Sequence, residues 1–114
     1  MKRGEIYIIQ IPFATGREMR KARPGVIVSG GELEGRGLMQ VALCSGSLEH
    51  GIVTHVPIGD LQKPSVAMCE HLYTVDKSRI GPLVGACTPE ELAEIDRALG
   101  IVLGLDGKGD KRGT

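Results

Sequence analysis

The chain has 114 residues, enough for one domain and too few for two ordinary ones. Trp is absent and only one Phe and two Tyr occur, so we expect an aliphatic core, and binding of nucleic acid by stacking bases on aromatic platforms is a poor fit. The formal net charge is zero, which argues against a protein that coats nucleic acid through bulk positive charge.

The cysteines and the apolar runs indicate the compartment. Cys44, Cys69 and Cys87 are widely spaced, with no CxxC pair and no clustered His, so neither a metal nor another cofactor is implied. The N-terminus lacks the apolar run of a signal peptide, and no run approaches the ~20 residues of a membrane span. We expect a cytoplasmic protein, away from membranes, with reduced thiols.

Short strands separated by Gly and Pro are predicted first. Residues 5–11 are rich in Ile and Tyr and precede Pro12, which predicts a strand. A second strand, 23–29, is entered through Pro24, because a proline cannot donate to a sheet ladder and belongs at a strand's start or edge. The glycine-rich, charged residues 30–37 are expected to form a mobile loop.

Further strands follow at similar spacing. They are predicted at 38–43, 51–58, 65–69 and 71–75, the last being either a sixth strand or the bent continuation of the fifth. Residues 76–79 are a turn or one short helical turn. This arrangement favours a small antiparallel barrel.

One helix is clearly marked near the C-terminus. Thr88-Pro89-Glu90-Glu91 offers an N-cap hydroxyl, a proline at the first helical position and a Glu that closes a capping box. Apolar residues then recur on one face, namely Leu92, Ile95, Leu99 and Val102. The helix is expected to end at Gly104, so the domain spans residues 1–104 and residues 105–114 form a disordered tail.

The stretch from Gly16 to Pro24 concentrates positive charge. Its cations are Arg17, Arg20, Lys21 and Arg23, with one carboxylate, Glu18. Because Arg23 and Pro24 run directly into an apolar strand, the charge is held on a rigid support. This pattern favours a site that grips phosphate.

Four short sequence blocks occur in a fixed order along the chain. Their ordered combination is more specific to one protein family than any single block. They are Arg3-Gly4-Glu5-Ile6-Tyr7, Gly16-x-Glu18 followed by Arg23-Pro24-x-Val26-Ile27-Val28-Ser29, the segment from Cys69 to Ile80, and Thr88-Pro89-Glu90-Glu91-Leu92. Over residues 3–103 they resemble the MazF/PemK family of toxins. The resemblance implies a mainly β fold with a C-terminal α-helix, a small SH3-like antiparallel barrel that CcdB shares, and usually a homodimer.

The resemblance also implies an activity. Such proteins are toxins of type II toxin–antitoxin systems that cleave single-stranded RNA at short sequences without a metal, leaving a 2′,3′-cyclic phosphate and a 5′-hydroxyl. A cognate antitoxin neutralises them by laying a disordered tail over the RNA groove. Metal-free cleavage needs a proton acceptor for the 2′-hydroxyl, a proton donor for the leaving oxygen, and fixed positive charge.

The catalytic residues implied by the family are Arg23, Ser45, Glu18 and Glu70. Arg23 matches the family's catalytic Arg before Pro, and Glu18 its loop Glu, which positions Arg23 or transfers a proton. Without the resemblance, Arg23 is simply a surface ion-pairing residue and Glu18 a solvated carboxylate. The family's second catalytic residue is a Thr, replaced here by Cys44 or Ser45, of which Ser45 is the better hydrogen-bond donor.

Glu70 and His71 form a second pair of interest. Glu70 aligns with an acidic residue that some PemK-like members use in proton transfer, and His71 stands where Gln is more usual. A histidine titrates near neutral pH and suits acid or base catalysis. Since consecutive side chains of a strand point to opposite faces, at most one of the two is expected to face the groove.

The remaining expectations concern RNA contacts and core positions. The residues expected to contact RNA are Arg17, Arg20, Lys21, Cys44, Ser47, His50, His71 and Arg79. Among them the loop cations would set affinity and not base choice. His55 is expected on the surface of the sheet, and Cys69 and Cys87 as small buried residues.

A non-catalytic protein of the same fold is the alternative. It would be a gyrase poison like CcdB, or a relative that has lost activity and only binds an antitoxin. The missing Thr favours this alternative, whereas the intact Arg23-Pro24 and the dense loop cations favour the enzyme.

Overall fold

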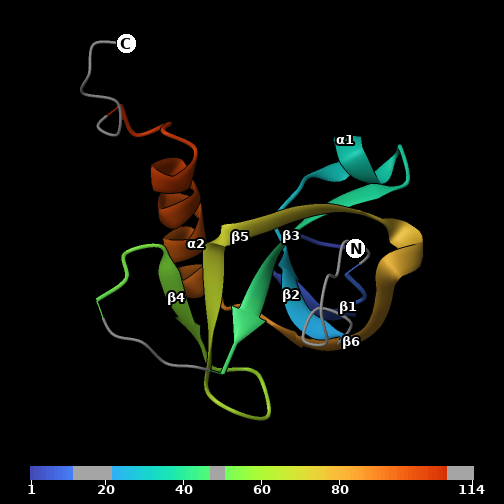
Figure 1. The fold of residues 1–114 in the computed structure, drawn as a ribbon, viewed down its shortest axis with the longest axis horizontal. Helices are drawn as coiled ribbons and strands as arrows, with labels where there is room; N and C mark the ends of the chain where they lie inside the picture. Colours follow the sequence, from blue (N-terminus) through green and yellow to red (C-terminus); the bar gives the residue numbers. More distant parts are fainter. Residues whose placement is uncertain (12–21, 47–50, 108–114) are drawn as a thin grey trace.

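The structure is a computed structural model that describes residues 1–11, 22–46 and 51–107. Its strands are β1 (Glu5–Ile9), β2 (Arg23–Ile27), β3 (Leu38–Ser45), β4 (His55–Ile58), β5 (Ser65–Asp76) and β6 (Ile80–Ala86). Its helical segments are α1 (Gly31–Glu34), the 3₁₀ turn η2 (Lys77–Arg79) and α2 (Pro89–Val102). Figure 1 shows β5 arching from beside α2 to η2. The predicted mainly β fold with a C-terminal helix is confirmed.

The six strands form one antiparallel sheet in the order β4-β5-β3-β2-β1-β6. The sheet is open, because its edge strands β4 and β6 do not pair with each other. The loop after β4 links the two edges instead: the Ala86 N–H donates to Asp60 Oδ2 at 3.0 Å, and the Gly59 N–H donates to Glu91 Oε2 of α2 at 3.0 Å. The predicted barrel is therefore corrected to a curved open sheet that a loop bridges.

The sequence left open whether residues 65–75 form two strands or one bent strand, which is β5 in the structure. It is one strand of 12 residues, so the alternative of a single bent strand is confirmed. The bend has a clear cause in the pairing with β3, where Ala42 faces Leu72 but Cys44 faces Ala67. Leu43 alone therefore faces residues 68–71, and these form a bulge that re-aims its side chains.

The sequence prediction missed β6, since Gly81, Pro82 and Gly85 read as strand breakers. β6 forms at the edge of the sheet and pairs with β1 through an irregular register, which tolerates such residues. It exposes Leu83 and Val84. The predicted loop at 30–37 contains the short helix α1.

Strand ends also differ from prediction. β1 ends at Ile9 and β2 ends at Ile27, each two residues before the predicted end. β3 continues to Ser45, two residues beyond the predicted end, and β4 begins at His55, four residues after the predicted start. The start of β4 follows a turn in which the His55 N–H donates to Ile52 O at 3.0 Å. Residues 51–54 therefore lie outside β4, although Thr54 O still accepts from the Cys69 N–H of β5 at 3.0 Å.

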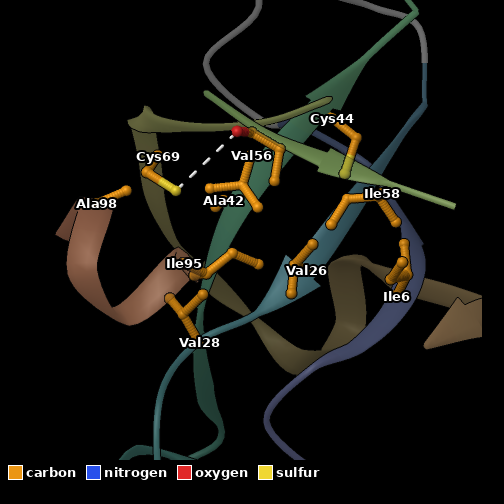
Figure 2. Close-up of a cluster of buried hydrophobic side chains, with 11 residues drawn as sticks. Ile6, Val26, Val28, Ala42, Cys44, Val56, Ile58, Cys69, Ile95 and Ala98 are labelled. Atoms are coloured by element: carbon orange, nitrogen blue, oxygen red, sulfur yellow. Dashed lines mark hydrogen bonds between the residues drawn. The ribbon is translucent and has the colours of Figure 1, made fainter. Parts of the chain in front are cut away.

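Aliphatic side chains fill two cores. The first, called here the helix core, lies between the sheet and α2 and contains Ile6, Val26, Val28, Ala42, Cys44, Val56, Ile58, Ala67, Cys69, Ile95 and Ala98. Figure 2 shows Ile95 and Ala98 directed from α2 toward these strand residues. The second contains Ile9, Ile27, Met39, Val41, Leu43 and Val75. The expected aliphatic core is thus present on both faces.

α2 begins as predicted. Thr88 Oγ1 accepts from the Glu91 N–H at 3.0 Å, and Glu91 Oε1 accepts from the Thr88 N–H at 2.9 Å, which completes the capping box. Leu92, Leu99 and Val102 pack beside Ile95 against the helix core. Gly104 adopts a φ of 72° directly after the helix, a conformation that favours glycine.

Residues 105–107, the start of the predicted tail, belong to the turn that ends α2, where the Leu105 N–H donates to Gly100 O at 2.7 Å. Residues 108–114 lie outside the described part, and the domain boundary at 104 stays a prediction. None of the described helices is long and apolar enough to cross a membrane.

Candidate active site

A pocket of about 250 Å³ opens where β2 begins, β3 ends and β5 bulges. It is lined by Ile11, Arg23, Leu43, Ser45, Met68, His71 and Tyr73. We call it the Arg23 pocket. It brings together three residues that the sequence singled out, Arg23, Ser45 and His71, from three different strands.

Close packing of β2 on β1 positions Arg23. Arg23 opens β2 and pairs with Ile9, and Gly25, two residues on, lies on the same face. A Cβ on Gly25 would come within 2.8 Å of Ile9 Cγ1, so only glycine allows this approach. No carboxylate of the described residues forms an ion pair with Arg23. Its guanidinium is thus not engaged by a carboxylate of this part of the chain.

Cys44 and Ser45 have opposite environments, although they are neighbours on β3. Cys44 is 2% exposed and points into the helix core, as Figure 2 shows, and burial raises the pKa of its thiol to about 12. Ser45 lines the Arg23 pocket. The geometry therefore favours Ser45 as the counterpart of the family threonine, and Cys44, expected to contact RNA, is turned away from the pocket.

Glu70 and His71 lie in the bulge of β5 and also diverge. His71 lines the Arg23 pocket, whereas Glu70 turns toward the start of β4. The Thr54 hydroxyl donates to Glu70 Oε1 at 2.6 Å, and His55 Nε2 lies 2.6 Å from Glu70 Oε2. His71 Nε2 lies 3.8 Å from the same Oε2. His71 is therefore part of the lining of the pocket and Glu70 is not.

The charge state of Glu70 follows from these contacts. Partial burial raises its pKa, but the hydrogen bonds from Thr54 and His55 outweigh this effect, and the net pKa is lowered. The carboxyl group is therefore ionised at neutral pH. An ionised carboxylate has no proton to donate, which argues against Glu70 as the acid.

The expectation that His55 lies on the sheet surface is wrong. Its side chain is 7% exposed, and its Nδ1 is buried without a hydrogen-bond partner among the described residues. The segment Val53-Thr54-His55-Val56 gave no sign of this, since the partner that buries and bonds the ring, Glu70, is distant in sequence.

The sequence reasoning also missed the apolar wall of the pocket, Ile11, Leu43, Met68 and Tyr73. The signal was present for Tyr73 only: it is two residues beyond His71, and alternate residues of a strand share a face. Met68 is placed by the bulge, which no periodicity reveals.

Several predicted site residues lie away from the pocket or outside the described ranges. Arg79 does not line the pocket. Its carbonyl oxygen accepts a hydrogen bond from the Gln10 N–H at 2.8 Å. The next residue, Ile80, pairs with Ile9 of β1, and Ile9 also pairs with Arg23. Arg79 thus lies at the same end of the sheet as Arg23. The residues outside the described ranges are Arg17, Glu18, Arg20, Lys21, Ser47 and His50. In residues 1–11, 22–46 and 51–107, no three His, Cys, Asp or Glu side chains gather to hold a metal ion.

Comparisons with known proteins identify the family. A family model described as PemK-like, MazF-like toxin of type II toxin-antitoxin system matches residues 2–103. The chain is 30% identical over 112 residues to the Endoribonuclease MazF of Staphylococcus epidermidis, covering 93% of each protein.

Solved structures show the same fold. MazF from Deinococcus radiodurans has a TM-score of 0.76 at 24% identity, with 91% of this chain and 96% of that chain covered. A mycobacterial endoribonuclease in complex with its cognate antitoxin has a TM-score of 0.73 at 24% identity, with 90% and 94% covered. The chain belongs to the PemK-like, MazF-like toxins of type II toxin–antitoxin systems.

Proposed function

We propose that this toxin is an endoribonuclease that cleaves single-stranded RNA in the Arg23 pocket, without a metal ion, to a 2′,3′-cyclic phosphate and a 5′-hydroxyl. The observation that carries the proposal is the meeting of Arg23 and Ser45 in one pocket. Family membership and the identity to an endoribonuclease support the class of activity.

Arg23 supplies the fixed positive charge. In the reaction, the 2′-oxygen attacks the adjacent phosphorus and negative charge grows on the non-bridging oxygens. A planar guanidinium holds two of these oxygens at once and keeps its charge at any working pH. Preorganised charge of this kind stabilises the transition state more than the ground state.

Ser45 supplies a hydroxyl at the pocket wall. A hydroxyl donates one hydrogen bond, which suits a phosphate oxygen. The non-catalytic alternative was favoured by the absence of the family threonine. Because Ser45 lines the pocket, a hydroxyl is present there, and that observation no longer favours the alternative.

The test is cleavage by the purified protein of RNA oligonucleotides in EDTA, with the end groups identified by mass spectrometry. We expect Arg23→Ala to lower the single-turnover rate by about 10²–10³-fold, the usual cost of removing one transition-state donor. Arg36→Ala is the matched control, because Arg36 is exposed and lies in the turn after α1, where it pairs only loosely with Glu32 at 3.8 Å. Full activity of Arg23→Ala, or products with a 3′-hydroxyl, would exclude the proposal.

A cognate antitoxin and a second copy of the chain are the proposed protein partners, acting with the toxin in the cytoplasm where RNA is translated. The antitoxin is supported by the complexes solved for proteins of this fold. A homodimer is supported by the exposed apolar side chains of the edge strand β6, Leu83 and Val84. Analytical ultracentrifugation should give twice the chain mass of 12.1 kDa, and a monomer at micromolar concentration would exclude the dimer.

A further inference from the structure

We propose that His71 donates the proton to the leaving 5′-oxygen, and that Glu70 is the positioning residue that holds its imidazole ready, itself fixed by Thr54 and His55. The role of His71 rests on the proposed cleavage of RNA. His71 would supply the proton donor that the cleavage step requires. Arg23 does not supply it, because a guanidinium does not give up its proton, and the hydroxyl of Ser45 is a poor acid.

Glu70 is held at both carboxylate oxygens. Oε1 accepts from the Thr54 hydroxyl at 2.6 Å and Oε2 lies 2.6 Å from His55 Nε2. His55 is the first residue of β4, which pairs with β5 through His55 and Met68, and Thr54 directly precedes it. With two short hydrogen bonds from neighbouring residues, the carboxylate has one preferred orientation.

His55 contributes a hydrogen bond to Glu70 Oε2 at 2.6 Å. Its Nδ1 is buried and has no hydrogen-bond partner among the described residues. The ring is therefore held against the carboxylate of Glu70, whose lowered pKa keeps it negatively charged at neutral pH.

That charge acts on His71. The Nε2 of His71 lies 3.8 Å from Glu70 Oε2, and the ring lines the Arg23 pocket. A carboxylate near Nε2 keeps a proton on that nitrogen, which fixes the tautomer of the neutral ring and leaves Nδ1 to exchange a proton with the substrate.

The groups around His71 explain why a carboxylate is needed. Arg23 from β2, Ser45 from β3 and Tyr73 from β5 line the same pocket as the ring, and Glu70 Oε2 lies 3.8 Å from its Nε2. Arg23 is a fixed cation, and a second cation beside it is disfavoured. Glu70 offsets this repulsion and allows the imidazolium to exist in the same pocket.

The proposed step balances without any further reagent. The 2′-oxygen forms a bond to phosphorus and its proton passes to water, while the bond between phosphorus and the 5′-oxygen breaks. The Nδ1 proton of the imidazolium moves to the 5′-oxygen. The neutral ring then regains a proton from solvent, so no proton is consumed overall.

The first experiment does not depend on cleavage. Imidazole ¹⁵N spectra of the full chain, with His71 assigned through His71→Gln, report which ring nitrogen carries the proton above neutral pH. We expect the fraction of His71 that carries it on Nε2 to be higher in the wild type than in Glu70→Gln. An unchanged tautomer in Glu70→Gln would overturn the positioning role.

The second experiment separates acid catalysis from structure. An RNA whose scissile 5′-oxygen is replaced by sulfur has a leaving group that needs no proton. We expect His71→Gln to slow cleavage of normal RNA by about 10²–10⁴-fold and to slow the sulfur substrate by less than about tenfold. Equal losses on the two substrates would overturn the role of His71.

A matched control completes the test. Glu70→Gln should slow cleavage of normal RNA, whereas Glu90→Gln, which changes an exposed carboxylate in the first turn of α2, should leave the rate unchanged. If Glu70→Gln fails to fold, the half-exposed His71 still allows the sulfur test. If the wild type does not cleave RNA, the proposed function fails, while the tautomer measurement still decides whether Glu70 orients His71.

Discussion

Ser45 is the residue on which the proposed chemistry differs most from the family pattern. It has the hydroxyl of threonine without the methyl group that stiffens a β-branched side chain. Ser45 is the last residue of β3 and lines the pocket, so the strand places its side chain at the pocket wall. Activity is therefore compatible with this substitution.

The prediction at this position uses three variants. Ser45→Ala should lower the single-turnover rate of RNA cleavage by about 10²-fold, the lower cost of losing one transition-state donor, and Ser45→Thr should retain the rate. Cys44→Ala should retain the rate per folded molecule and lower stability, since Cys44 is buried in the helix core. A result in which only Cys44→Ala loses the rate would assign the family position to Cys44.

The carboxylate of Glu70 also predicts a dependence of stability on pH. Its pKa in the folded protein is lowered below the ordinary value of 4.5 by the hydrogen bonds from Thr54 and His55, which outweigh burial. The ionised group therefore adds stability above pH 4.5, and this contribution is lost as pH falls through the folded pKa. Urea unfolding should show Glu70→Gln less stable than wild type at pH 7, with the difference shrinking near pH 3. A difference that is constant with pH would contradict the assignment.

At the scale of elements, α2 is the part best determined by local sequence. Its capping box forms as the residues Thr88 and Glu91 predict. We expect Thr88→Ala to lower the free energy of unfolding by about 1 kcal/mol, the usual cost of an N-cap, and Thr88→Ser to preserve it, as measured by urea unfolding.

Glu91 should be the more sensitive residue of the capping box. Its Oε1 completes the box, and its Oε2 accepts from the Gly59 N–H of the loop after β4. Glu91→Ala should therefore cost more stability than Thr88→Ala. Equal costs would mean that the contact with Gly59 contributes nothing.

β5 and β6 contain features that the local sequence does not predict. The alternation and turn signals located five of the six strands, because each has apolar residues between Gly or Pro. β6 was missed because a strand that holds two glycines and a proline is stabilised by its edge position and its neighbour β1, not by propensity. The bulge of β5 was equally hidden, since it results from pairing with a shorter stretch of β3.

At the scale of the molecule, the loop after β4 connects the edges of the open sheet. A Cβ on Gly85 would overlap the backbone oxygen of Asp60, so this approach requires glycine. We expect Gly85→Ala to lower the free energy of unfolding by about 1–3 kcal/mol through overpacking.

Gly100 provides the matched control for that substitution. It lies inside α2, and a Cβ there would meet nothing within 4 Å. Gly100→Ala should raise stability by about 0.5–1 kcal/mol, because alanine loses less backbone entropy in a helix. Thermal unfolding of the two variants should thus move in opposite directions, and a neutral Gly85→Ala would show that the loop does not hold the edge.

The sequence by itself determined the family, the mainly antiparallel fold, the start of α2 and the importance of Arg23 and the Cys44-Ser45 and Glu70-His71 pairs. These follow from short segments whose meaning is local. Only the tertiary structure decided that Ser45 and His71 enter the Arg23 pocket while Cys44 and Glu70 turn away, and that His55 is buried against Glu70. Which face a side chain takes depends on strand pairing and on the β5 bulge, and those are set by contacts between residues far apart in the chain.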